Sequence, residues 1–227
     1  MTVSRRVLFF APLLTVPLFA QQAVAATRET DVSKVFVFLD NFLRMSPAER
    51  ARLKVDFYLT QNGNPPKGIR AWWIDKDGTR TDVPIAADGR FEKEPSLRQL
   101  VEKSKMVFEG SSAGNFSVRI GLVWGAKPAI EMDARAVANH LNDANALVKK
   151  AAGKFGMVAP KMVQVAFPGG GSGTAVMADG KTAPLPLFKG SPAFNPTAQA
   201  GAARLRFARA PWRMEFAGPK HSGVVFG

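Results

Sequence analysis

The sequence of 227 residues contains no cysteine, only two histidines and a single tyrosine. The absence of cysteine excludes disulfide bonds, thiolate zinc sites and a cysteine nucleophile, so ordinary core packing has to supply the stability. The scarcity of histidine leaves little for acid–base chemistry near neutral pH, because histidine is the side chain that titrates there. We therefore expect no metal site and no other cofactor, and we expect a protein that is not an enzyme.

Acidic residues are also scarce. The chain has 31 Lys and Arg against 18 Asp and Glu, which is a formal net charge of +13. The imbalance is strongest near the C-terminus, where residues 151–227 contain nine Lys and Arg but only Asp179 and Glu215 as acids. The hydrophobic share of 46% is nevertheless that of a globular protein with a core. A basic surface of this kind favours an anionic partner.

Long apolar runs are missing apart from one near the N-terminus. The apolar residues 7–20 follow two arginines and precede the small-x-small sequence Ala23-Val24-Ala25. This is the pattern of a secretory signal peptide, cleaved just before Ala26. A membrane-spanning helix needs about 20 apolar residues, and two prolines interrupt this shorter run. The sequence therefore predicts export to the periplasm, with residues 1–25 removed and no transmembrane segment in the mature chain.

The rest of the chain divides into strands and two long helices. Apolar residues recur at helical spacing from Asp31 to Met45 and again from Asp133 to Ala152. Strict alternation marks strands, most clearly at Leu53–Leu59 and Phe116–Trp124. Asp-Gly turns between short strands indicate an antiparallel meander. The predicted fold is α+β, with an antiparallel β-sheet of about nine strands and two main amphipathic helices packed on it.

The length of the mature chain suits one large domain or two small ones. We predict a single α+β domain that spans residues 26–227. The alternative is a pair of small β-rich domains that are joined near Gly153–Pro160.

A faint internal repeat is visible in the sequence. Asp77–Ile85 aligns with Asp179–Leu187 at an offset of 102 residues, and each copy runs from an Asp-Gly turn into a strand with an apolar-Pro-apolar centre. A duplication of a helix-plus-meander unit would give halves at residues 31–130 and 133–217. Coincidence is the other explanation, because Asp-Gly turns are common.

A particular order of segments runs from Val32 to Phe167. A helix is followed by Val-Asp-Phe-Tyr-Leu (55–59), a Pro/Gly loop, Ala-Trp-Trp (71–73), an Asp-Gly turn, Pro-Ile-Ala (84–86) and the stretch Asn142–Phe167. This order resembles an uncharacterised family of exported bacterial proteins of unknown function. The resemblance implies that an obvious enzyme signature should not be expected, and it assigns no site residues.

Three partial motifs are better explained by turns and helix surfaces than by catalysis or metal binding. Ala175–Thr182 fits a relaxed P-loop, but Pro184 follows too closely for the helix that a P-loop requires. Residues 75–82 resemble the start of a calcium loop, yet the acidic residue that should end the loop is missing. His140 has only Asp143 at a ligand-like spacing, which is too few groups for a metal site. We interpret all three as structural.

The adjacent residues Trp72 and Trp73 are the first binding candidates. They lie on one predicted strand, so their side chains point to opposite faces of the sheet. If the second face is open, one tryptophan forms an exposed apolar patch with Arg70, Ile74 and Tyr58. The alternative is that a helix covers this face.

Four arginines near the C-terminus are the second binding candidates, because they alternate with apolar residues. On strands, this alternation places the guanidinium groups on one face and the core on the other. We expect these arginines to lack acidic partners and to form a surface for polyanions. They are Arg204, Arg206, Arg209 and Arg213. A merely basic surface without a ligand is the alternative.

Two classes of function follow. The first is an exported, periplasmic, non-enzymatic binding or accessory protein of the cell envelope that recognises an anionic or amphipathic ligand or a protein partner. Export argues against nucleic acid, so the expected partners are anionic lipid, lipopolysaccharide or an envelope protein. The alternative is a periplasmic hydrolase with a dispersed Ser/His/Asp or carboxylate site. A pocket where His140 or a carboxylate pair meets a nucleophile or water would favour the hydrolase. A groove lined by Trp72 or Trp73, or a face of arginines, would favour the binding protein.

Overall fold

The computed structural model describes residues 26–110, 116–153, 161–218 and 223–225. The predicted signal peptide and most of the predicted linker at residues 153–160 lie outside these ranges. The chain is a mixed α+β protein with antiparallel strand pairing, as the sequence predicted, but the described strands form three sheets and not the single sheet that was expected. Within the described ranges, none of the helices has both the length and the apolar character needed to cross a bilayer.

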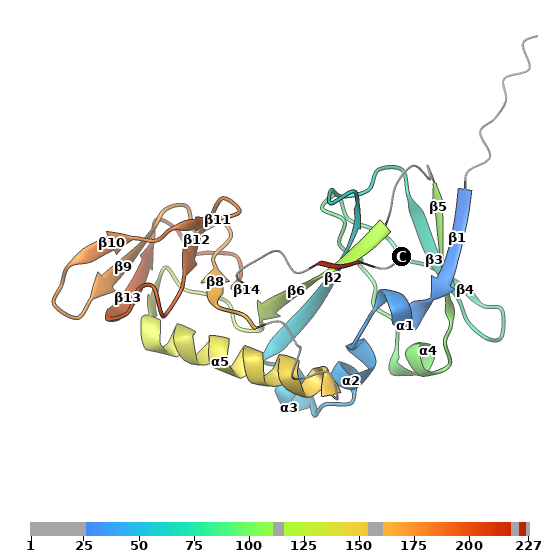
Figure 1. The fold of residues 1–227 in the computed structure, drawn as a ribbon, viewed down its shortest axis with the longest axis horizontal. Helices are drawn as coiled ribbons and strands as arrows, with labels where there is room; N and C mark the ends of the chain where they lie inside the picture. The colour runs from blue at the N-terminus through green and yellow to red at the C-terminus, as the bar shows by residue number, and fades with distance from the viewer. Residues whose placement is uncertain (1–25, 111–115, 154–160, 219–222, 226–227) are drawn as a thin grey trace, which may run out of the picture.

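The first half of the described chain, residues 26–124, builds one end of the molecule (Figure 1). Its strands are β1 (Ala26–Asp31), β2 (Leu53–Gln61), β3 (Arg70–Ile74), β4 (Arg80–Asp82), β5 (Lys105–Gly110) and β6 (Phe116–Trp124). Its helices are α1 (Val32–Val35), α2 (Leu39–Leu43), α3 (Pro47–Arg50) and α4 (Leu97–Val101). Four of the strands form a sheet in the order β1-β5-β3-β4.

The second half, residues 131–225, builds the other end (Figure 1). Its first elements are β7 (Glu131–Asp133), α5 (Ala134–Ala151), β8 (Gln164–Ala166), β9 (Gly173–Met177) and β10 (Thr182–Pro184). The remaining strands are β11 (Leu187–Phe188), β12 (Ser191–Phe194), β13 (Ala202–Phe207), β14 (Glu215–Ala217) and β15 (Gly223–Val225). Four of these strands form a sheet in the order β7-β13-β9-β10.

A central sheet joins the two halves. β2 pairs with β6 along its whole length, from Leu53↔Trp124 to Gln61↔Phe116. The other edge of β6 pairs with β14 and β15, and β14 continues the sheet to β8, β12 and β11. The junction of the halves therefore lies between β6 and β14. Two hydrophobic cores flank it, and Phe42, Val55 and Ile120 pack against both.

The two end sheets correspond strand by strand and residue by residue. In the first half β1 pairs with β5, β5 with β3, and β3 with β4 across the Asp-Gly turn. In the second half β7 pairs with β13, β13 with β9, and β9 with β10 in the same way. The backbone hydrogen bonds of the two turns also match, because the residue numbers in each pair of bonds differ by 102. They are Gly78 N–H to Asp75 O and Gly180 N–H to Met177 O, and Val83 N–H to Ala71 O and Leu185 N–H to Gly173 O.

The helices of the two halves differ, and here one prediction is wrong. The predicted helix over Asp31–Met45 is broken into α1 and α2 by Phe38, whose φ of 64° lies in the left-handed region. Its apolar stripe is buried as expected, but the ring of Phe36 packs on Phe57 and Phe91, with ring centroids 5.0 and 5.1 Å away. Both contacts join segments that are distant in the sequence, so the local spacing of apolar residues does not indicate them.

The predicted helix over Asp133–Ala152 is confirmed as α5. Asp133 is its N-cap and accepts a hydrogen bond from the backbone N–H of Ala136 at 2.7 Å. The buried residues Val137, Leu141 and Ala144 follow helical spacing along one face. α5 is therefore the one long amphipathic helix among the described residues, and it runs beneath the central sheet (Figure 1).

Candidate ligand-binding site

The two tryptophans do not form an exposed patch. Trp73 is 1% exposed and belongs to the hydrophobic core of the first half. Trp72 is 8% exposed, and the guanidinium of Arg80 lies 3.9 Å from the centroid of its ring. Of the two alternatives left open by the sequence, the face is therefore covered and not open. The cover on Trp72 includes a cation from the neighbouring strand β4, a contact that depends on strand pairing. Arg70 is exposed and forms an ion pair with Glu109 of β5.

The C-terminal arginines alternate with core residues as predicted, since Leu205 and Phe207 are buried. They do not all lack acidic partners, however. Glu131 of β7 accepts from Arg204 at 2.8 Å and from Arg206 at 3.0 Å. The pKa of Glu131 is accordingly lowered, above all by the hydrogen bond from Arg206. The predicted polyanion face is thus partly neutralised by a strand that lies 73 residues away in the sequence.

Of the other two arginines, only one remains at this surface. Arg209 is exposed and forms no ion pair within the part of the chain that the structure describes. Arg213 instead lies in the central sheet region, where it pairs with Glu215 and approaches Asp56 Oδ2 at 3.9 Å. The four arginines therefore do not act as one cluster.

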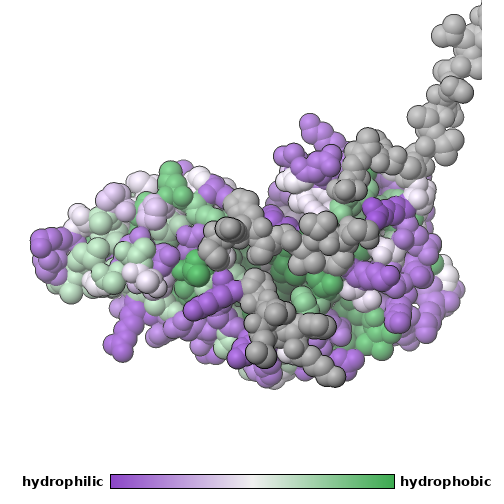
Figure 2. Space-filling model, viewed as in Figure 1, coloured by the Kyte–Doolittle hydropathy of each residue, from purple (hydrophilic) through white to green (hydrophobic). Residues whose placement is uncertain are grey.

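A cavity of about 480 Å³ lies where the two halves meet. Figure 2 shows hydrophobic surface in a recess between the two ends of the molecule. α2 lines the cavity on one side and α5 on the other, and strands β2, β6 and β14 of the central sheet complete its walls. Its apolar lining includes Leu39, Phe42, Val55, Ile120, Leu122, Leu147, Val148, Ala151, Met162 and Phe216. Both halves therefore contribute to one apolar chamber.

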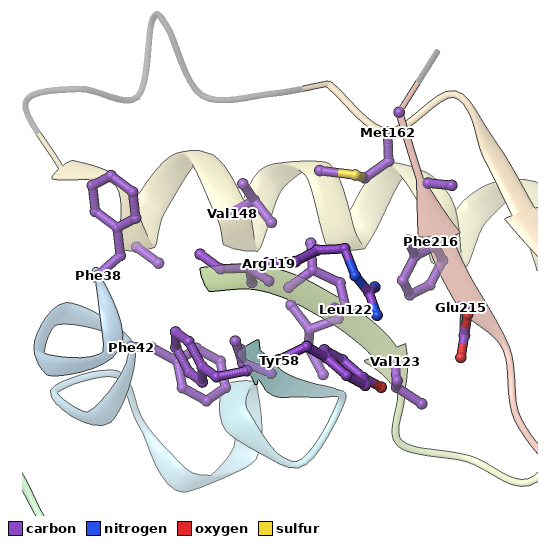
Figure 3. A pocket seen from close by; sticks show the side chains of 18 of the residues that line it. Phe38, Phe42, Tyr58, Arg119, Leu122, Val123, Val148, Met162, Glu215 and Phe216 are labelled. Carbon is purple, nitrogen blue, oxygen red and sulfur yellow. The ribbon is translucent and has the colours of Figure 1, made fainter. Parts of the chain in front are cut away.

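The break after α1 shapes one end of this cavity. Phe38 is the left-handed residue at the break, is 38% exposed and lines the cavity. Figure 3 shows Phe38 and Phe42 on the α2 side, with Val148 of α5 facing them across the space. A left-handed conformation is unfavourable for a bulky residue and persists where the surrounding packing maintains it. The residue at which the helix breaks therefore contributes an aromatic ring to the cavity.

The cavity also reaches the face of the sheet that is remote from the helices. β14 pairs with Leu122 and Val123 of β6, and β15 pairs with residues 117–119, so Ile120 and Gly121 have no ladder partner on this edge within the described residues. Both of them line the cavity. Because side chains alternate along a strand, Ile120 faces the helices and Arg119 faces the opposite side. The cavity is therefore lined by an apolar side and a polar side of the same strand.

Polar side chains gather on that second side. The hydroxyl of Tyr58 donates to Asp56 Oδ2 at 3.5 Å, and Lys54 Nζ lies 3.1 Å from Asp56 Oδ1. Burial raises the pKa of Tyr58. Burial also opposes the charge of Arg213, but Glu215 and its other neighbours outweigh that effect and raise its pKa. Arg213 is thus neutralised by carboxylates of the protein itself.

Two other cations at this end lack such partners. The guanidinium of Arg119 lies 4.0 Å above the ring of Tyr58, and Lys189 lies in the turn between β11 and β12. Among the described residues, neither forms an ion pair with a carboxylate. Partial burial lowers the pKa of Lys189, the positive charge of Arg119 lowers it further, and Glu215 offsets part of the shift. The polar end of the cavity therefore contains positive charge that the described residues do not neutralise.

The described histidine lies elsewhere. His140 on α5 stacks on Trp124, with ring centroids 4.3 Å apart, and burial lowers its pKa. It does not line the cavity. Within the described ranges, no three His, Asp or Glu side chains are grouped as a metal site would require.

Comparison of the chain with family models, with curated proteins and with solved structures gives no match. The function therefore has to be inferred from the site itself. Sequence reasoning missed Arg119, Lys189 and Phe38 as site residues. Arg119 occupies an outward-facing position of β6, where a polar residue is expected in an alternating strand. The sequence carries no signal that a cavity lies beside it.

Proposed function

We propose that this chain is an exported, non-enzymatic binding protein of the bacterial cell envelope, which holds one small amphipathic ligand in the cavity between its two halves. The observation that supports the proposal most is the pairing of an apolar chamber with a polar end inside one cavity. Small-molecule sites are typically apolar spaces of about 300–1,000 Å³ with a few polar groups that orient the ligand. The cavity has this composition and size.

The apolar chamber suits the hydrocarbon part of such a ligand. Phe42, Val55 and Ile120 are partly buried although they pack against both cores, so each keeps apolar surface that a ligand would cover. Covering apolar surface gains about 25 cal/mol per Å². A ligand with an apolar chain therefore gains binding energy here without a change in the fold.

The polar groups favour binding over hydrolysis. Glu215 is paired with Arg213, and the hydroxyl of Tyr58 donates to Asp56. A hydrolase would need a base within hydrogen-bond reach of a nucleophile or water in the cavity. The described groups are engaged with one another instead, as in a site that orients a ligand.

A cavity-filling variant tests the proposal. Ala151 of α5 lines the cavity, whereas Ala146 on the same helix is exposed. The neutral apolar dye N-phenyl-1-naphthylamine should bind the wild-type protein saturably at one site, with a rise in fluorescence. Ala151→Trp should remove most of this signal, and Ala146→Trp should leave it unchanged. Equal binding by both variants, or no saturable binding by the wild type, would overturn the proposal.

We also propose that the two halves descend from one duplicated unit. The shared strand order of the end sheets and the matched turn hydrogen bonds support this. Asp31 and Asp133, again 102 residues apart, both stand at the N-cap of the helix that follows the first strand.

A further inference from the structure

We propose that Arg119 and Lys189 bind the anionic head group of the ligand, a carboxylate or a phosphate monoester, while its apolar chain lies along Ile120 in the chamber. This inference rests on the proposed function and specifies the chemistry of the ligand. It assigns a binding role to two residues on opposite sides of the junction between the halves.

The first argument concerns charge. Three cations and two acids line this part of the cavity: Arg119, Lys189, Arg213, Glu215 and Asp88. Glu215 is paired with Arg213, and the carboxylate of Asp88 accepts from the backbone N–H of Arg90 at 3.1 Å within its own turn. Arg119 and Lys189 therefore keep their charge without an acidic partner among the described residues. An anion between them would supply that partner.

The second argument concerns the geometry of Arg119. One face of its guanidinium rests on the ring of Tyr58, and its backbone pairs with β2 on one side and β15 on the other. Tyr58 is held in turn, because Gly121 leaves room for its ring: a Cβ at Gly121 would lie 2.8 Å from Tyr58 Cε2. A guanidinium stacked in this way keeps its N–H edge available, and that edge matches two oxygens of a carboxylate or phosphate.

The third argument concerns the position of Arg119 in the cavity. Arg119 directly precedes Ile120 in β6, and both residues line the cavity together with Leu122 and Phe216. A head group at Arg119 is therefore adjacent to the apolar chamber. Figure 3 shows Arg119 and Tyr58 in the middle of the cavity, with Phe216 beside them and Phe42 and Val148 farther toward α2 and α5. One elongated ligand can contact both regions.

The test compares twelve-carbon amphiphiles that differ only in the head group. Dodecanoate and dodecyl phosphate are the two anionic probes, dodecanol is neutral and dodecyltrimethylammonium is cationic. Each is titrated below its micelle concentration against the protein loaded with N-phenyl-1-naphthylamine. We expect at least one anionic probe to displace the dye about ten-fold more tightly than dodecanol, because a hydrogen bond to a charged group contributes on this scale. The cationic probe should bind most weakly, and the better of the two anions identifies the head group.

Variants then assign the effect to residues. Arg119→Gln and Lys189→Gln should each reduce affinity for the preferred anion several-fold, and leave dodecanol binding unchanged. Arg119→Lys should recover part of the anion preference, since it restores the charge but not the planar fork. Arg206→Gln is the matched control, because Arg206 is an exposed cation paired with Glu131 outside the cavity. It should bind every probe like the wild type.

The outcomes separate the two proposals. If all four probes bind the wild type alike, the head-group inference is wrong and the apolar binding function stands. If none displaces the dye and the dye itself does not saturate, the binding function is wrong as well. If the anion preference persists in the Arg119→Gln/Lys189→Gln double variant, with thermal unfolding as in the wild type, the head group is held by other residues.

Discussion

The two halves of this protein share their sheets but not their helices. Each end sheet has the same strand order, and the Asp-Gly turns match in register. In the second half a single helix, α5, follows the first strand, whereas in the first half the chain breaks at Phe38 into α1 and α2. The chamber lies between α2 and α5. The comparison shows that the sheets provide the common framework and that the helices account for the asymmetry of the site.

Side-chain volumes at matching positions are distributed differently in the two cores. Trp73 in β3 corresponds to Ala175 in β9, and both are almost completely buried. The core of the second half contains other rings, such as Phe167, which follows β8, and Phe207 of β13, whose centroids are 4.6 Å apart. Cores tolerate such exchanges when the total volume and the pattern are preserved. Similar folds of the two halves therefore do not require similar sequences.

The largest expected effect concerns whether the halves unfold together. Met106 and Leu205 occupy matching positions in β5 and β13, and each is completely buried in its own core. Met106→Ala and Leu205→Ala should each cost about 2–5 kcal/mol of unfolding free energy. Because Val55 and Ile120 pack against both cores, we expect one transition that shifts as a whole in both variants.

Guanidinium unfolding followed by tryptophan fluorescence and by far-UV circular dichroism measures this effect. The two probes should give the same midpoint in the wild type and in each variant. Two separate transitions, with each variant shifting only one, would contradict the single-domain prediction and make the halves independent units.

A smaller effect tests whether the two turns are equivalent. Gly78 and Gly180 have φ of +83° and +84°, and a Cβ at either would meet no atom within 4 Å. Gly78→Ala and Gly180→Ala should therefore each destabilise the protein by about 1 kcal/mol, from backbone strain alone. Urea titrations should show equal shifts. If one variant is neutral and the other is not, the turns are alike only in hydrogen bonding.

The N-caps should respond unequally, which sharpens the contrast between the helices. Asp133 accepts the capping hydrogen bond of α5, and Asp133→Ala should cost about 1 kcal/mol. Asp31 makes no such bond and instead accepts from Lys105 Nζ at 2.8 Å. Asp31→Ala should therefore have the smaller effect, with Asp31→Asn separating charge from shape. Thermal unfolding of the three variants ranks their stabilities. A larger loss of stability for Asp31→Ala than for Asp133→Ala would contradict the capping role given to Asp133.

The smallest expected effect is a pH dependence of one contact between the halves. Glu49 of α3 accepts from Lys150 of α5 at 2.5 Å, and this bond together with those from Ser46 lowers the pKa of Glu49 to about 2. Because the folded pKa lies below the usual 4.5, the contribution is present above pH 4.5 and is lost as the pH falls toward 2. Both groups are exposed, so screening keeps it small.

Glu49→Gln isolates this effect. The variant should lose less stability than the wild type as the pH falls from above the usual pKa of 4.5 to the folded pKa of about 2, and should resemble the wild type at still lower pH. Asp179→Asn is the control, because Asp179 pairs with Lys181 inside a single turn. Identical pH profiles for Glu49→Gln and wild type would show that the contact adds nothing.

Much of the fold could be predicted because its signals are local. The alternation of residues 116–124 identified β6, and the apolar spacing after Asp133 identified α5. The candidate site was largely missed for the opposite reason. Glu131 neutralises Arg204 and Arg206 across strands that are distant in the sequence, and Arg119 and Lys189 line one cavity although they belong to different halves.

The sequence by itself determined elements such as β2, β6 and α5, the antiparallel α+β class and the basic charge, since each follows from residue spacing and composition along the chain. The tertiary structure alone decided which cations remain unpaired, where the first helix breaks and that the halves enclose a cavity. The physical reason is that charge neutralisation and enclosed volume depend on distances between segments. Periodicity specifies which face of a segment is buried, but not which segment covers it.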